Sequence, residues 1–219
     1  MKTLIFGATG AAGGGVLQAC LSASDVDEVR VVIRRPLPHI SDKLRVFVHD
    51  NFLNYAAITK AFVGIDACLY CLGTSATQVS GETEYRRITY DFALAVAEML
   101  KLHSPNAVFH FISGRGASPD SRFMWARVKA ETERDLLAQT NTVCWRPAFI
   151  NGESLAIGPQ RPLLHQLVRS FFRFTKPFRH LYVESEDIGR AMLQATAEKL
   201  RGRVIENAEI REMANRYQK

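Results

Sequence analysis

The sequence has few of the features that mark membrane-spanning, disulfide-stabilised or metal-binding proteins. No uninterrupted apolar run approaches the length of about 18 residues that a membrane-spanning helix needs. The four cysteines, without a secretion signal, predict reduced thiols, and the six histidines form no HxxxH, HExxH or Cys/His cluster. We therefore expect no transmembrane segment, no disulfide framework and no metal site.

The amino-terminal segment has little room for a targeting signal. Apolar residues 4–6 are followed by glycines that begin at Gly7 and recur through Gly15. A secretory signal needs an apolar stretch of about 7–15 residues, which these glycines interrupt. The expected location is the cytoplasm.

Acidic residues are scarce relative to basic ones, with 22 Asp and Glu against 28 Lys and Arg, a net charge of +6. Such an excess fits nucleic acid, an anionic membrane surface or a phosphorylated small ligand. No nucleic-acid recognition module is visible, so we expect no nucleic-acid partner. With 219 residues and 47% apolar residues, the chain fits one globular domain spanning 1–219.

Apolar runs of strand length alternate with segments of helical period. Strands are predicted at Thr3–Phe6, Val29–Ile33, Leu44–Val48, Ala67–Leu72, Ala107–Ile112, Val143–Arg146 and Arg203–Ile205. Helices are predicted at Gly14–Leu21, Tyr55–Phe62, Glu84–Leu102, Phe123–Ala138, Leu163–Phe174 and Glu186–Ala197, with a short helix at the end. This alternation, with continuously apolar strands, predicts an α/β fold: a doubly wound parallel β-sheet in three αβα layers, the Rossmann fold.

A GxxGxxG motif lies at the junction of the first strand and the first helix. Glycines permit a tight turn and close backbone approach, so amide groups and the positive end of the helix can hold a pyrophosphate. The alternative is a glycine-rich connection without a ligand. The predicted cofactor-binding residues of this turn are Gly7, Thr9, Gly10, Ala11, Ala12 and Gly13.

The end of the second predicted strand carries two arginines in place of an acid. An NAD site usually offers a carboxylate there for the ribose 2′-hydroxyl, whereas Arg34 and Arg35 would attract a 2′-phosphate. The pair predicts NADP(H) over NAD(H). Ordinary solvated charges at a strand end are the alternative.

Nearly the whole chain resembles the short-chain dehydrogenase/reductase superfamily, in its extended and atypical, epimerase-like members. GIDACLYCLGT at 64–74, FISGRGA at 111–117 and RPAF at 146–149 are most similar to the atypical branch related to Tat-interacting protein. The resemblance implies that Asp50 and Asn51 lie near the adenine and that the run Arg146, Pro147, Ala148 and Phe149 closes over the nicotinamide. It also implies cofactor contacts from Cys71, Leu72, Gly73 and Thr74, and a structural role for Asp187.

The superfamily's catalytic set is a Ser after the fifth strand and a YxxxK pair on the next helix. This chain keeps Ser113 and Lys129 but has Trp125 at the Tyr position. An indole N–H can donate a hydrogen bond but cannot give up a proton near neutral pH. The resemblance assigns Ser113 and Lys129 to catalysis, and Lys129 also to the cofactor ribose.

Two hypotheses follow from the missing phenol. In the first, which we favour, the protein is an NADP-dependent oxidoreductase acting on a small carbonyl-type substrate, with Ser113, Ser118 or a water held by Lys129 as proton donor. In the second, it binds NADP(H) without turnover, as a sensing or protein-interaction module. The resemblance also suggests a homodimer.

The basic excess is concentrated in residues 154–183, which hold five basic residues and no acid. The resemblance implies that this segment, at about 151–183, forms the substrate side of the fold, where it would suit an anionic substrate. A membrane-surface helix, an acidic protein partner, or a packed amphipathic helix with a solvated charged face fits the same pattern.

Two further candidates have structural interpretations. Cys68 and Cys71 form CxxC on a predicted strand, where positions three apart point to opposite faces, so we expect buried cysteines rather than a redox pair. Cys20 and Cys144 are interpreted in the same way. His110 lies in an apolar strand and is expected to be a core histidine with its hydrogen bonds satisfied.

Overall fold

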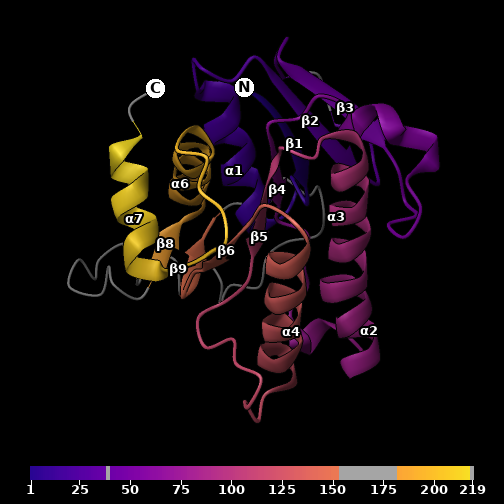
Figure 1. Ribbon diagram of the computed structural model, residues 1–219, viewed down its shortest axis with the longest axis vertical. Helices are drawn as coiled ribbons and strands as arrows, with labels where there is room; N and C mark the ends of the chain where they lie inside the picture. Colours follow the sequence, from indigo (N-terminus) through magenta and orange to yellow (C-terminus); the bar gives the residue numbers. More distant parts are fainter. Residues whose placement is uncertain (38–39, 153–181, 218–219) are drawn as a thin grey trace, which may run out of the picture.

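A seven-stranded parallel sheet forms the centre of the molecule (Figure 1). The computed structural model describes residues 1–37, 40–152 and 182–217. The strand order is β3-β2-β1-β4-β5-β6-β9, and every neighbouring pair is parallel. The strands are β1 (Lys2–Phe6), β2 (Glu28–Ile33), β3 (Leu44–Val48), β4 (Ala67–Tyr70), β5 (Val108–Ile112), β6 (Thr142–Arg146) and β9 (Arg203–Glu206). The order reverses between β1 and β4, which confirms the predicted doubly wound αβα fold.

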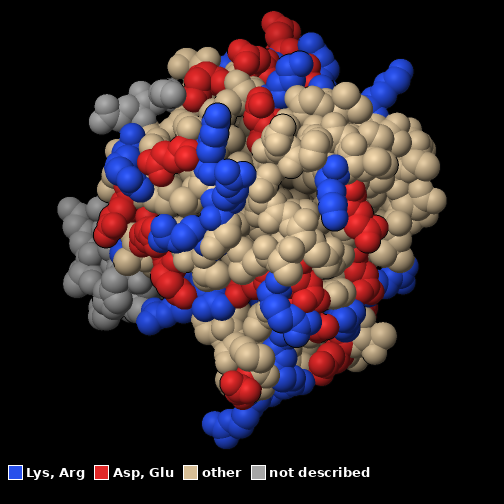
Figure 2. Space-filling view, viewed as in Figure 1, with Lys and Arg blue, Asp and Glu red and all other residues tan. Residues whose placement is uncertain are grey.

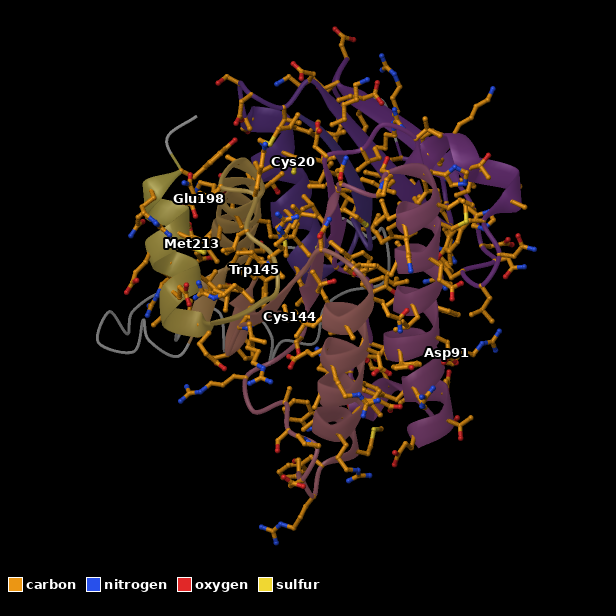
Figure 3. The ribbon with its side chains drawn as sticks, in the orientation of Figure 1. Cys20, Asp91, Cys144, Trp145, Glu198 and Met213 are labelled. Carbon is orange, nitrogen blue, oxygen red and sulfur yellow. The ribbon has the colours of Figure 1, made fainter. Side chains whose placement is uncertain are left out.

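Two apolar cores cover the two faces of this sheet. Along β1, Ile5 belongs to one core while Leu4 and Phe6 belong to the other, because side chains alternate along a strand. The first core is closed by α1 (Ala11–Ser22), α6 (Ser185–Ala197) and α7 (Asn207–Arg216). The second is closed by α3 (Phe92–His103), α4 (Met124–Gln139) and the 3₁₀ helix η1 (Ala56–Phe62). Trp145 and Cys144, adjacent on β6, lie in opposite cores (Figure 3).

The long helix predicted at Glu84–Leu102 is interrupted. It consists of α2 (Glu82–Arg86), a π-helical turn η3 (Arg87–Asp91) and α3. A π-turn accommodates one extra residue per turn, and an ion pair between Arg86 and Asp91, 3.0 Å apart and five positions apart in sequence, spans it. The apolar period predicts the helix but not this local change of winding.

The predicted helix Tyr55–Phe62 is a 3₁₀ helix, and its carbonyl end is bound by an arginine from β2. Arg30 Nη1 donates to the carbonyl oxygens of Lys60 at 2.8 Å, Ala61 at 3.1 Å and Val63 at 2.8 Å. Ile58 departs from helical backbone angles within this segment. A short 3₁₀ helix, η2 (Ala76–Gln78), follows β4.

A second, two-stranded sheet was missed by the sequence analysis. Strands β7 (Phe149–Asn151) and β8 (Tyr182–Glu184) pair in parallel, and at three residues each they are too short to show a periodic signal. Gly152 follows β7 against the start of α1, where an added Cβ would lie 2.0 Å from the Ala11 carbonyl oxygen. The predicted helix Leu163–Phe174 and nearly all of the basic segment 154–183 lie outside the described residues.

Helices α1 and α6 pack closely because each presents a glycine to the other. A Cβ on Gly189 would lie 2.6 Å from the Ala19 Cβ, and one on Gly15 would lie 2.6 Å from the Glu186 nitrogen. On the first turns of α6, Arg190 forms ion pairs with Glu186 and Asp187. On the visible surface, basic and acidic side chains are interspersed (Figure 2).

His110 is a buried core residue with both ring nitrogens hydrogen-bonded, as predicted. The Trp145 indole Nε1 donates to His110 Nδ1 at 3.1 Å, so Nε2 carries the proton and faces the Thr196 hydroxyl oxygen at 2.9 Å. Thr196 in turn donates to the Met192 carbonyl at 2.8 Å. Burial lowers the pKa of His110 to about 3.

The buried neutral imidazole predicts a loss of stability in acid. The unfolded chain binds a proton at His110 below about pH 6.5, whereas the folded chain binds it only near pH 3. The contribution of neutral His110 to the free energy of unfolding is therefore fully present above pH 6.5. It is lost as pH falls toward 3, at up to about 1.4 kcal/mol per pH unit. Denaturant unfolding of His110→Gln from pH 7 to 4 should show a shallower decline than wild type. His49→Gln is the matched control for loss of a histidine elsewhere in the chain, and the slope of His110→Gln should be shallower than that of this control.

Candidate functional site

The glycine motif brings three chain segments into contact. Gly7 has a φ of +76°, and a Cβ there would lie 2.7 Å from the carbonyl carbon of Cys71. A Cβ on Gly13 would lie 2.1 Å from the Gly7 carbonyl oxygen, and the Gly10 nitrogen donates to the same oxygen at 2.9 Å. These approaches allow the start of α1 to sit directly above the ends of β1 and β4.

A cavity of about 710 Å³ opens at this edge of the sheet. Its wall includes nine predicted site residues: Gly10, Ala11, Ala12, Cys71, Leu72, Gly73, Thr74, Ser113 and Lys129. They come from the start of α1, from the chain after β4 and β5, and from α4, at the point where the strand order reverses, which is where doubly wound sheets bind ligands. The cavity is also lined by five residues that were not predicted as site residues: Ser75, Gln78, Ile112, Ile150 and Gly152.

The other predicted residues do not form the wall of this cavity. Gly7 and Thr9 lie within the turn and Gly13 lies in the first turn of α1, and Gly7 and Gly13 serve backbone packing. Arg34 and Arg35 are exposed after β2, and in the part of the chain that the structure describes neither has an ion-pair partner. Asp50 and Asn51 are exposed after β3. Pro147 and Ala148 follow β6, where the Ala148 nitrogen donates to Asn207 Oδ1 at 2.9 Å.

Lys129 and Ser113 meet at the end of β5. Lys129 Nζ donates to the Ser113 carbonyl oxygen at 2.5 Å and to that of Ile112 at 3.4 Å. Burial lowers the pKa of Lys129 to about 8, and the Glu133 carboxylate opposes this shift. The Ser113 hydroxyl is buried and has no hydrogen-bond partner among the described residues. The site therefore offers an ammonium group with a lowered pKa of about 8 and a hydroxyl without a hydrogen-bond partner among the described residues.

Trp125 lies one helical turn before Lys129 and reaches the same loop. A Cβ on Gly114 would lie 3.6 Å from Trp125 Cζ3 and 3.7 Å from Lys129 Nζ. The indole stacks on Phe123, with ring centroids 6.4 Å apart and an interplanar angle of 24°, and Phe123 is 66% exposed. The indole thus lies beside Lys129, as the WxxxK spacing predicts.

Glu133 is part of this site and was not predicted from the sequence. Glu133 lies four residues after Lys129 on α4 and is buried, with its carboxylate held by Arg146 from the end of β6. A KxxxE spacing on the predicted helix could have indicated the acid. Its half-buried arginine partner comes from a distant strand, and no local pattern reveals that contact.

The four cysteines are free thiols, as predicted. Cys20, Cys68 and Cys144 are buried, while Cys71 is half-buried and follows β4 at the cavity. Burial raises the pKa of Cys20 to about 12 and that of Cys68 well above its ordinary value. Protonated, weakly nucleophilic thiols on or beside a strand fit the structural interpretation of CxxC.

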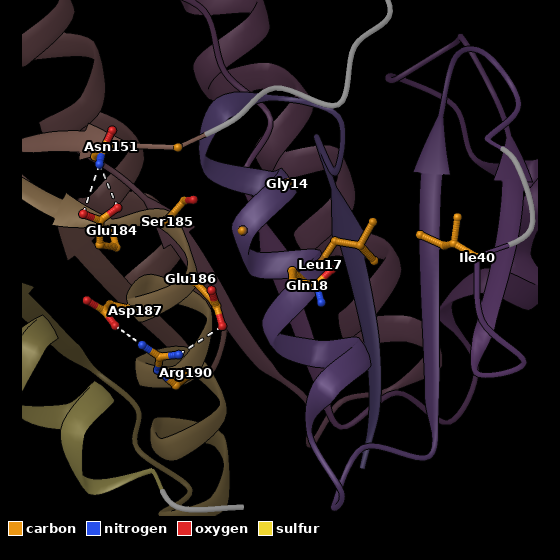
Figure 4. A pocket seen from close by; sticks show the side chains of 12 residues that line it. Gly14, Leu17, Gln18, Ile40, Asn151, Glu184, Ser185, Glu186, Asp187 and Arg190 are labelled. Carbon is orange, nitrogen blue, oxygen red and sulfur yellow. Dashed lines mark hydrogen bonds and ion pairs between the residues drawn. The ribbon is translucent and has the colours of Figure 1, made fainter. Parts of the chain in front are cut away.

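A second cavity, of about 620 Å³, lies between α1 and the start of α6 (Figure 4). Its polar groups are largely engaged with one another. Asn151 Nδ2 donates to both carboxylate oxygens of Glu184, at 3.0 and 2.9 Å, and Arg190 pairs with Glu186 at 3.1 Å.

Among the described residues, no helix is long and apolar enough to cross a membrane, and no group of three or more His, Cys, Asp or Glu could hold a metal ion.

Curated relatives of this chain are mitochondrial proteins by name. No family model matches the chain. Protein FMP52, mitochondrial, of Eremothecium gossypii is 29% identical over 155 residues, which is 70% of this chain and 68% of that protein. The Saccharomyces cerevisiae protein of the same name is also 29% identical, over 70% and 67% of the two chains. The predicted cytoplasmic location is wrong on this comparison, because an interrupted secretory signal says nothing about import into an organelle.

Solved structures with the same architecture are short-chain dehydrogenases/reductases. One from Saccharomyces cerevisiae superposes with a TM-score of 0.68 over 99% of both chains at 12% identity. An oxidoreductase of this family from Burkholderia thailandensis gives 0.71 over 94% of this chain and 90% of that one, at 16% identity. WbmF from Bordetella bronchiseptica, in complex with NAD+, gives 0.69 over 98% and 76%, at 14% identity. The chain therefore has the αβα fold of the short-chain dehydrogenases/reductases.

Proposed function

We propose that the protein is an NADP(H)-dependent oxidoreductase that acts on a small carbonyl-type substrate. The observation that carries the proposal is the single cavity shared by the glycine turn, the chain after β4, Ser113 and Lys129. Support comes from neighbours of the same fold that were solved with NAD, among them MoeE5 with UDP-glucose and WbmF. We also propose that the protein belongs to the branch related to Tat-interacting protein, that it forms a homodimer and that its substrate is anionic.

The residues present fit a dinucleotide. No acid stands in the first turn of α1, where the first amide groups of a helix lack intrahelical partners. The backbone of Gly10, Ala11 and Ala12 would hold the pyrophosphate, and Lys129 would bind ribose hydroxyls. Arg34 and Arg35 would receive the 2′-phosphate. The bound cofactor supplies the hydride for reduction of a carbonyl.

The protein's own residues would stabilise the substrate oxygen and its proton. The Ser113 hydroxyl, which has no partner among the described residues, would donate to that oxygen. Lys129, largely protonated below about pH 8, would favour negative charge as it develops and hold a water that delivers the proton. Trp125 would contribute no proton, because an indole N–H is not acidic near neutral pH.

A second candidate function is NADP(H) binding without turnover. The observation that favours it is the indole beside Lys129, at the position where the superfamily carries its phenol. The protein would then act as a nucleotide-sensing or interaction module. Both functions require the cofactor site, so they are separated by turnover and not by binding.

Cofactor preference tests the binding half of the proposal. Titrations of wild type should give a dissociation constant for NADPH at least about tenfold below that for NADH, because two charge-assisted contacts to the 2′-phosphate are available. Arg34→Ala/Arg35→Ala should weaken NADPH binding by roughly 10- to 100-fold and leave NADH binding unchanged. Arg45→Ala, an exposed arginine on neighbouring β3, is the matched control. Equal affinity of wild type for the two cofactors would refute the NADP(H) assignment.

A further inference from the structure

An ion pair joins a buried carboxylate on α4, one turn beyond Lys129, to a half-buried arginine at the end of β6. The Glu133 side chain is 5% exposed, and among the described residues it is the one acidic side chain that is buried. Arg146 donates from Nε to Oε1 at 2.9 Å and from Nη2 to Oε2 at 2.6 Å, so both carboxylate oxygens are engaged. Two parallel bonds fix the orientation of both side chains.

Glu133 is linked to Lys129 through the helix. The two residues are four apart on α4, so their side chains lie on the same face one turn apart. Lys129 Nζ reaches the Ser113 carbonyl just after β5, while Glu133 reaches Arg146 on β6. One face of α4 is thereby attached to the ends of two adjacent strands.

The backbone closes this arrangement. The Ser113 nitrogen donates to the Trp145 carbonyl at 2.8 Å, and the Arg115 nitrogen donates to the Pro147 carbonyl at 2.9 Å. Arg146 lies between these two acceptors. The loop that carries Ser113 is thus anchored on both sides of the residue that binds Glu133, and displacement of Arg146 would move the Ser113 loop with it.

Few other charges face Lys129. The cavity wall at 10–12 and 71–74 carries no charged side chain, and burial keeps the Cys71 thiol protonated by raising its pKa. Beyond Glu133 and Arg146, the titratable groups of this network are Glu206, which is 56% exposed and 3.3 Å from Arg146, and the buried Cys144 thiol. Glu133 opposes the lowering of the Lys129 pKa, and the guanidinium of Arg146 offsets part of its field.

We propose that Glu133 and Arg146 are positioning residues of the site: they hold Lys129 and the Ser113 loop in register and set the charge that Lys129 carries in the cavity. The assignment of that cavity to a cofactor and substrate rests on the proposed function. The positioning role itself concerns only the protein's own side chains.

The two halves of the pair should shift the Lys129 pKa in opposite directions. Glu133→Gln removes the negative charge and leaves the guanidinium, so the pKa should fall by roughly one unit. Arg146→Met leaves an uncompensated carboxylate, so the pKa should rise by a similar amount. Titration of the lysine 13Cε and 15Nζ signals by NMR, with the Lys129 signal assigned by its loss in Lys129→Arg, measures both shifts without any cofactor.

The double variant keeps the test valid if one single variant does not fold. Replacing both members leaves no uncompensated buried charge, so Glu133→Gln/Arg146→Met should fold. The Lys129 pKa of the double variant should lie between those of Glu133→Gln and wild type. Loss of Arg146 removes a repulsion that Glu133→Gln keeps, and loss of Glu133 removes the stronger attraction, because Glu133 lies one turn from Lys129 on the same helix. Glu131→Gln is the matched control, because it makes the same chemical change on the same helix. Glu131 pairs with Arg86, and its side chain is 34% exposed.

Shifts of the same sign in both single variants, or shifts no larger than that of Glu131→Gln, would overturn the inference. The ordered series would support it even if wild type failed to bind NADPH, in which case the positioning role stands and the proposed function fails. If NADPH binds, its affinity should fall above the Lys129 pKa of each variant, because the protonated amine is the form that donates.

Discussion

Gly13→Ala is expected to destabilise the protein by roughly 3 kcal/mol or more and to abolish NADPH binding, although it adds a single methyl group. The added Cβ would lie 2.1 Å from the Gly7 carbonyl oxygen, 2.7 Å from the Gly7 carbonyl carbon and 2.9 Å from the Ala8 Cα. All three neighbours are backbone atoms of the turn after β1, so no side-chain rotation relieves the overlap. Helix α1 must move away from the sheet, and the cavity wall at Gly10–Ala12 moves with it.

Two other glycines separate the possible causes of this loss. Gly64 has a φ of +68° and open space around its missing Cβ, so Gly64→Ala tests backbone strain alone and should cost about 1–2 kcal/mol. Gly81 has neither a left-handed φ nor a neighbour within 4 Å, and Gly81→Ala should leave stability unchanged. Denaturant unfolding ranks the three variants, and NADPH titration follows those that fold. A Gly13→Ala protein as stable as Gly81→Ala would contradict the packing explanation.

The fold was predictable because its signals are local and repeated. The central strands are largely apolar, and β4 is apolar and buried throughout, which indicates a sheet covered on both faces; the alternation of strands and helices indicates parallel order. Strand β7 and the π-turn at Arg87–Asp91 were not predictable by the same means. A three-residue strand has no period, and the π-turn changes winding without changing the apolar face.

The site residues that belong to a local sequence motif were predictable. The glycine turn, the chain after β4, Ser113 and Lys129 meet in one cavity because strand ends of a parallel sheet share an edge. The contact between Glu133 and Arg146 joins a helix to a strand in three dimensions, and the charge pattern alone does not pair them. The basic segment 154–183 illustrates a different limit, since its composition is unusual but compatible with several partners.

The largest expected gain of function is in Trp125→Tyr, which should raise NADPH-dependent carbonyl reduction by about 10²- to 10⁴-fold. The indole lies beside Lys129, where a phenol would have an ammonium neighbour to lower its pKa and could pass a proton to the substrate oxygen. Stacking on Phe123 is available to either ring, so the fold should tolerate the change. The measurement is the loss of NADPH absorbance across a panel of aldehydes, ketones and enones.

Trp125→Phe is the control that isolates the hydroxyl. It provides an aromatic ring of similar size to Tyr without a proton to donate, so its rate should match wild type. A gain shared by both variants would indicate that substrate access, and not acid catalysis, limits the wild-type protein. Hydride transfer is the cofactor's own chemistry and needs only a substrate correctly placed beside it. If wild type and Trp125→Tyr both bind NADPH tightly and neither oxidises it with any member of the panel, the oxidoreductase proposal therefore fails. NADP(H) sensing then becomes the function that the site supports.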